Sequence, residues 1–209
     1  MMRICALLVV AVLFVHPARA GNTEDVYHSA CKAYSQGHYS IAFRDLLPFA
    51  ARGDAWSQFA IAEMLRTGSG VARNQEEALV WYRRAAEQGY GPAQCNLGTA
   101  LYNGWGTAPD PQAAIGWWIR GALNRNPRSM FNLGTELARG SYIVRDYVRA
   151  YRWLTEAFNL GYLPAEKVRE TLRQAMTPFQ IRVAEKMSLY DALKFERREL
   201  PAPANPPAP

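Results

Sequence analysis

The sequence predicts an all-α fold, a right-handed superhelical solenoid of antiparallel helical hairpins. The main observation is an internal period of 36 residues, in which one slot holds glycine three times and another holds tryptophan three times. These residues are Gly68, Gly104 and Gly140, and Trp81, Trp117 and Trp153. A second observation is that apolar residues recur at helical spacing twice in each period, as at 55–66 and 75–88. Repeats of about 20–50 residues that each form one such hairpin stack into solenoids.

The ends of the expected helices carry residue types that begin and end helices. We expect each first helix to end at the repeated glycine, where a left-handed C-cap costs little. Each second helix begins after a side chain that accepts a hydrogen bond from the first-turn amides. These side chains are Asn74, Asp110 and Asp146. Glycine ends the second helices at positions 53, 89 and 161, but Arg125 takes this slot in the middle repeat. The turn there is therefore expected to rely on a flanking asparagine or to be distorted.

The period also divides the chain into units. Residues 55–90, 91–126 and 127–162 are the three repeats, residues 22–54 an N-terminal capping hairpin, and residues 163–198 the C-terminal capping helices. Thr177, Pro178 and Gln180 have the spacing of a capping box, so a last helix is expected to begin there. Residues 199–209 are rich in proline and cannot pack, which predicts a disordered tail.

The first twenty residues have the pattern of a cleaved secretory signal. Arg3 precedes a 12-residue apolar run at 4–15, and Ala-Arg-Ala at 18–20 is a small-x-small cleavage site. The run is shorter than the roughly 20 residues that a spanning helix needs. We expect a periplasmic or secreted protein without membrane insertion after cleavage. Its 22 basic and 18 acidic residues give a net charge of +4.

Residues suited to catalysis or metal binding are sparse. After signal removal the only histidines are His28 and His38, ten residues apart and without a third ligand. No nucleophile elbow or phosphate loop is found. We therefore expect no catalytic, cofactor-binding or metal-binding residue. The mild positive charge lacks the dense basic run of a nucleic-acid binder, and its functional alternative is attraction to anionic glycan or lipid.

The two remaining cysteines are expected to be free thiols. Cys31 falls in the first helix of the cap and Cys95 in the first helix two units further on. At about 8–10 Å per helix layer, their separation should be on the order of 20 Å. A disulfide requires Cα atoms within about 7 Å.

The repeat resembles the Sel1-like repeat, a longer-looped relative of the tetratricopeptide repeat. The motifs are Gly68-Ser69-Gly70 with Trp81-Tyr82, and Leu97-Gly98 with Gly104-Trp105-Gly106 and Trp117-Trp118. The third repeat has Tyr142 where the second loop glycine is expected. The resemblance implies a non-enzymatic scaffold or regulator of a bacterial envelope assembly or signalling system. Its implied partner is another envelope or periplasmic protein or peptide segment, and we expect a monomer.

The same resemblance implies one enzymatic alternative. Some secreted members of the family are assigned β-lactam binding or hydrolysis, and those members are cysteine-rich, with a pair in every repeat. The mature chain has only Cys31 and Cys95. A β-lactam enzyme is therefore the alternative hypothesis, and direct binding of anionic glycan or lipid is a third.

Candidate partner-binding residues are the aromatic and basic ones that the repeat pattern does not require. We expect the first helices to line the inner, concave wall and to turn these side chains away from the core stripe. They are Trp56, Phe59, Arg66, Tyr102, Trp105, Arg128, Phe131 and Arg139. Aromatic rings beside arginines are typical of interaction hot spots. The alternative for Phe59 and Phe131 is burial between adjacent first helices. The three repeated tryptophans are expected to fill the gap between successive hairpins.

Overall fold

The computed structural model describes residues 23–194, which form helices joined by loops and contain no strand. The expected signal at 1–20 and the expected tail at 199–209 lie outside the described residues. The helices are α1 (Thr23–Ser35), α2 (Tyr39–Ala51), α3 (Ala55–Thr67), α4 (Gln75–Glu87), α5 (Gly91–Asn103), α6 (Pro111–Leu123), α7 (Pro127–Arg139), α8 (Tyr147–Asn159), α9 (Pro164–Gln174), α10 (Pro178–Lys186) and α11 (Leu189–Ala192).

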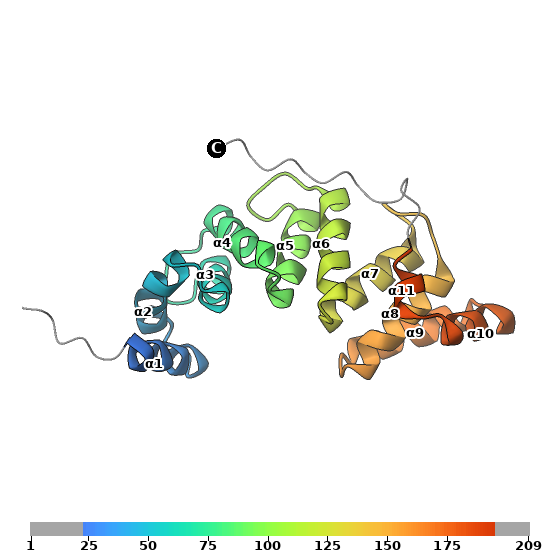
Figure 1. The fold of residues 1–209 in the computed structure, drawn as a ribbon. Coiled ribbons are helices and arrows are strands. Elements are labelled where there is room, and N and C mark those ends of the chain that lie inside the picture. The colour runs from blue at the N-terminus through green and yellow to red at the C-terminus, as the bar shows by residue number, and fades with distance from the viewer. Residues whose placement is uncertain (1–22, 195–209) are drawn as a thin grey trace, which may run out of the picture.

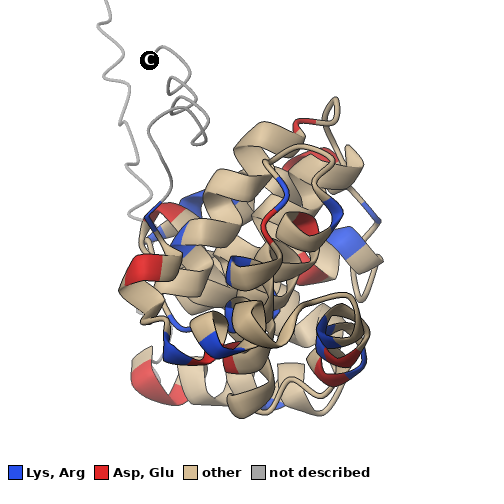
Figure 2. Ribbon diagram, turned by 90° about the vertical axis from the view of Figure 1, so that its right-hand side faces the viewer, with Lys and Arg blue, Asp and Glu red and all other residues tan. Residues whose placement is uncertain are grey.

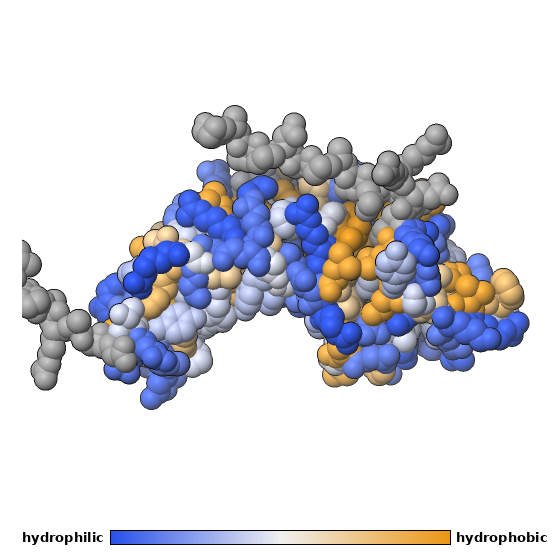
Figure 3. Space-filling view, viewed as in Figure 1, coloured by the Kyte–Doolittle hydropathy of each residue, from blue (hydrophilic) through white to orange (hydrophobic). Residues whose placement is uncertain are grey.

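Consecutive helices pair as hairpins that follow one another along an arch (Figure 1). The first helices also contact each other across repeats, α5 with α7 and α7 with the next helix, α9. No contact of that extent joins α4 with α6, or α6 with α8, in the described part of the chain. In a curved stack, the helices that approach one another more closely lie on the inner side. The exposed faces of α3, α5 and α7 therefore form what we call the inner wall, and the space-filling view shows the arch hollowed on its underside (Figure 3).

The helix ends form as the sequence predicts. Asn74, Asp110 and Asp146 each accept a hydrogen bond from the backbone N–H three residues on. Left-handed glycines end α3, α5 and α7. The capping box at Thr177 forms with both of its bonds. The last helix is interrupted, however: α10 ends at Lys186, and Ser188 caps the short α11.

The turn at Arg125 is not distorted, because Arg125 itself adopts the left-handed conformation. Its φ is 56°, and no other non-glycine residue within 23–194 has a positive φ. The flanking Asn124 supports the turn by donating from Nδ2 to the Gly89 carbonyl at 3.0 Å and to Gln94 Oε1 at 2.9 Å. A side chain in this conformation costs about 1–2 kcal/mol, so the middle repeat carries strain that the glycine-terminated units avoid.

The core runs through the hairpins, and one repeated tryptophan departs from it. Trp81 and Trp153 are buried as predicted. The prediction is wrong for Trp117, which is half-buried, with the Arg120 guanidinium 4.5 Å from its ring centre. The buried ring of this pair is Trp118, 5% exposed. Trp118 occupies the repeat slot that Tyr82 occupies in the first repeat, so a larger ring fills this slot in the second repeat.

The loops interlock neighbouring repeats. Gly70 and Gly106 have φ of 72° and 73°, and a Cβ at either would collide with backbone atoms at the start of α2 or α4. Each of these loops therefore rests on the first turn of the preceding second helix. The third loop has Tyr142 at this slot, with no left-handed backbone, and Gln112 of α6 donates to its carbonyl at 2.9 Å.

Both thiols are free, as predicted. Cys31 is half-buried and Cys95 is buried, and neither is in a disulfide. Burial raises the pKa of both thiols, which keeps them protonated at neutral pH. No helix within residues 23–194 is long and apolar enough to cross a membrane.

Candidate partner-binding site

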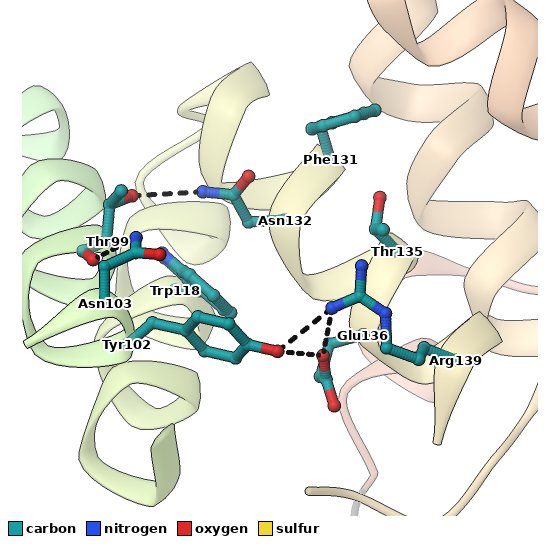
Figure 4. Close-up of a pocket in the computed structure, with 9 residues that line it drawn as sticks. All are labelled: Thr99, Tyr102, Asn103, Trp118, Phe131, Asn132, Thr135, Glu136 and Arg139. Atoms are coloured by element: carbon teal, nitrogen blue, oxygen red, sulfur yellow. Dashed lines mark hydrogen bonds and ion pairs between the residues drawn. The ribbon is translucent and has the colours of Figure 1, made fainter. Parts of the chain in front are cut away.

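A cavity of about 260 Å³ opens on the inner wall between α5 and α7 (Figure 4). Helix α5 contributes Thr99, Tyr102 and Asn103, α6 contributes Trp118, and α7 contributes Phe131, Asn132, Thr135, Glu136 and Arg139. Most of these positions recur at i, i+3 and i+4, so they share the exposed face of their helix. The cavity thus combines three aromatic rings with short polar side chains and one exposed arginine.

Glu136 connects the residues at one edge of this cavity through its hydrogen bonds, beside the Tyr102 hydroxyl in Figure 4. Its side chain is 2% exposed and accepts hydrogen bonds from the Tyr102 hydroxyl at 3.1 Å and from the backbone N–H groups of Ser141 and Tyr142 at 3.1 and 2.9 Å. Burial, and then Glu136 itself, raises the pKa of Tyr102, so the phenol remains a donor at neutral pH. These bonds satisfy a buried carboxylate that would otherwise be costly. They also hold the third loop, which lacks its second glycine.

Arg139 lies above this carboxylate and remains open to solvent. Its Nη1 donates to the Tyr102 hydroxyl at 3.0 Å and approaches Glu136 at 3.5 Å. The Arg139 side chain is 54% exposed. Within residues 23–194, its Nε and Nη2 make no hydrogen bond. The Glu136 carboxylate therefore contacts only Nη1 of the guanidinium.

A line of polar contacts connects the first helices along the inner wall. Asn96 of α5 donates to Glu63 of α3. One repeat later, Asn132 of α7 donates to Thr99 of α5 at 3.4 Å. Both bonds span 33 residues, so they are the same contact repeated. They fix the spacing of successive first helices and hence the shape of the wall.

The structure brings together three of the residues that the sequence singled out. Tyr102, Phe131 and Arg139 all line the cavity. Phe131 is half-buried and its ring centre lies 5.2 Å from that of Tyr162, so it also packs against the end of its own repeat. Phe131 is therefore partly buried, but by Tyr162 after α8 and not between adjacent first helices, and it still lines the cavity between α5 and α7.

The other five candidates lie elsewhere, and two of them are held by contacts within the chain, one by ring packing and one by hydrogen bonds. Trp56 packs against the rings of the cap, with its centre 5.6 Å from that of Tyr34. Arg66 bonds Glu63 at 2.8 Å and the Tyr82 hydroxyl at 3.1 Å. Neither residue projects freely from the core stripe as the sequence suggested.

Phe59, Trp105 and Arg128 complete the set. Phe59 is half-buried against Tyr90, with ring centres 5.3 Å apart. Trp105 is exposed on its loop and Arg128 is exposed at the start of α7. None of the three lines the cavity, so the cavity and these residues are separate parts of the surface.

Sequence reasoning missed two polar residues of the cavity, Asn132 and Glu136. Glu136 occupies a slot that holds Met64 and Ala100 in the other repeats. The sequence did contain a signal for Glu136. It is an acid in an otherwise apolar slot, and it occurs in the repeat whose loop lacks the second glycine. Within residues 23–194, no group of three His, Cys, Asp or Glu is placed to hold a metal ion.

Comparisons with known proteins agree with the fold. The family model described as the Sel1 repeat matches residues 57–90, 91–126 and 127–162, about half of the chain. The chain is similar to c5321, a protective antigen of uropathogenic Escherichia coli strains with an SLR fold, at 28% identity and a TM-score of 0.71. It is also similar to a Sel1 repeat protein from Oxalobacter formigenes, at 22% identity and a TM-score of 0.68.

The two similarities cover different shares of the compared chains. The match to the antigen covers 79% of this chain but 36% of the antigen, so the chain spans about a third of that protein. The match to the Oxalobacter protein covers 83% of this chain and 76% of that one. No curated protein matches the chain significantly.

Proposed function

Because the chain belongs to the Sel1 repeat family, we propose that it is a non-enzymatic, exported scaffold or regulator that binds another protein of the cell envelope. Solenoids of this kind present an extended concave surface to their partners. The apolar run and cleavage pattern of residues 1–20 support export. The partner would belong to an envelope assembly or a signalling system.

The observation that carries the proposal is the cavity on the inner wall. It is the place where aromatic rings, amide side chains and an exposed guanidinium meet on one surface. Rings supply contact area, and an arginine supplies oriented hydrogen bonds, which is the composition of a binding hot spot. We place the partner contact at Tyr102, Asn103, Phe131 and Arg139.

The charge distribution favours a protein over an anionic glycan or lipid. In the view of Figure 2, basic and acidic positions alternate along the helices instead of forming one basic surface. Binding to an anionic membrane or polysaccharide depends on clustered basic charge. A protein partner can use the mixed charges individually.

Photo-crosslinking in the native host tests the proposal. A benzoylphenylalanine at Asn103, exposed at the rim of the cavity, should give a covalent adduct with one envelope protein. The same group at Val80, 49% exposed on the second helix α4, is the matched control and should give none. Equal adducts at both positions, or adducts only at Val80, would move the binding surface away from the inner wall.

A further inference from the structure

We infer that the cavity receives an extended peptide segment that inserts one apolar side chain and places a neighbouring Asp or Glu on Arg139. The inference rests on the proposed function and names the chemistry of its partner. It follows from three features of the inner wall: its accessible charge, the free side of Arg139, and the size of the cavity.

The accessible charge of the inner wall is positive, because in both of its ion pairs the carboxylate is more deeply buried than the guanidinium. Glu136 is 2% exposed while its partner Arg139 is 54% exposed. The neighbouring pair repeats this arrangement, with Glu63 19% and Arg66 32% exposed. Both carboxylates are occupied by donors of the protein. A ligand therefore meets guanidinium groups rather than carboxylates.

Arg139 retains the geometry needed for a second carboxylate. Glu136 already accepts from a phenol and two backbone amides, so the long 3.5 Å contact with Arg139 leaves most of the guanidinium unused. A guanidinium binds a carboxylate through two parallel N–H donors. Nε and Nη2, which make no bond within the described residues, are adjacent donors of this kind.

The size of the cavity selects an extended segment. A volume of about 260 Å³ corresponds to a cube roughly 6 Å on a side, whereas a helix with side chains is about 10–12 Å across. One side chain fits, and a whole helix does not; an extended segment in addition leaves its backbone groups free to bond the wall, whereas a helix uses them internally. Tyr102, Trp118 and Phe131 give that side chain an apolar environment. The amide of Asn103, exposed at the rim, can bond the backbone of the segment.

A random dodecapeptide library displayed on phage tests this chemistry without presuming a sequence. Selection on the full-length mature protein should enrich peptides in which Asp or Glu lies beside an aromatic or aliphatic residue. A selected peptide should then bind Arg139→Gln about 10-fold more weakly or worse, because a charged hydrogen-bond pair is lost. Arg182→Gln, which removes the same charge from exposed α10, is the matched control and should bind within about twofold of wild type.

A second variant avoids any disturbance of Glu136. Asn103→Asp adds a negative charge at an exposed position of the rim and should weaken acidic peptides several-fold. The melting temperature should fall by only about 1–3 °C, because the variant loses the 2.8 Å hydrogen bond to the Thr99 carbonyl and puts the charge at the C-terminus of α5. Enrichment of basic or uncharged peptides would overturn the inference. No enrichment, combined with a cross-link at Asn103, would overturn the extended-segment class and leave the proposed function standing. Arg139-dependent binding to phosphatidylglycerol vesicles, without peptide enrichment, would replace the peptide by a lipid.

Discussion

Gly98 and Trp118 are in close contact, so the effect of replacing either residue on stability can be predicted. A Cβ added to Gly98 would lie 2.6 Å from both Cδ1 and Nε1 of Trp118 and 3.0 Å from the carbonyl oxygen of Ala114. The indole is buried and the carbonyl belongs to a helix, so neither can move freely. Overpacking of this kind costs about 1–3 kcal/mol. Exchanging glycine for alanine inside a helix returns up to about 1 kcal/mol. We expect Gly98→Ala to destabilise the protein by about 1–2 kcal/mol.

The first repeat shows which ring is compatible with a Cβ atom at the position of Gly98. Ala62 and Tyr82 occupy the same slots there, and both are buried. A six-membered ring thus coexists with an alanine at this contact. Trp118→Phe alone should leave a void and cost about 1–2 kcal/mol, less than the 3–5 of full truncation. In the double variant the new methyl group should fill that void, giving a favourable coupling of about 1–2 kcal/mol.

Urea unfolding followed by circular dichroism at 222 nm measures the four free energies of this cycle. Gly134→Ala with Trp118→Phe is the matched control, since the added Cβ there would meet Leu154 at 2.9 Å and not the indole. Its two effects should add. Additive effects for Gly98→Ala and Trp118→Phe as well would mean that the close contact does not set the choice of glycine.

Three other outcomes are expected. Arg125→Gly should raise the free energy of unfolding by about 1 kcal/mol, or about 2–4 °C in Tm, by removing left-handed strain, whereas Arg125→Ala should bring no gain. Above pH 10 stability should fall, because burial raises the pKa of Tyr34 to about 12 and raises that of Tyr82 as well, so the unfolded chain loses these protons first. A Tm that stays flat from pH 9 to 11.5, or falls as steeply in Tyr82→Phe, would contradict this. Trp117→Ala should lower Tm by more than Trp105→Ala but should leave the protein folded, since Trp117 is only half-buried. Thermal melts that rank the two variants in the opposite order would contradict the burial described here.

The repeat pattern was sufficient to predict the hairpins, because capping and C-terminal glycines act within a few residues. The N-caps at Asn74, Asp110 and Asp146 and the capping box at Thr177 are local and were predictable. The partial exposure of Trp117 was not, since adjacent helical positions differ by 100° and the repeat slots of both Trp117 and Trp118 favour the core.

The candidate site was predictable only in part, for a related reason. Tyr102, Phe131 and Arg139 were found because they depart from the repeat pattern on the exposed face of their helices. Trp56 and Arg66 depart from it too, but Trp56 is held by Tyr34 of the cap and Arg66 by Tyr82 on the other helix of its own hairpin. Such contacts connect residues that no local pattern relates. Glu136 was missed because its donors come from the loop that follows it.

The interlocking loops limit how this protein can change by duplication of its units. The segment 127–162 carries Tyr142 where Gly70 rests on α2 and Gly106 rests on α4. At either earlier position its side chain would meet the backbone of the neighbouring helix already at the Cβ atom. The reverse exchange would supply a glycine but remove Glu136, which holds the third loop. The three units are therefore not interchangeable, and an array lengthened by internal duplication could not use a copy of the third unit in the place of the first or second.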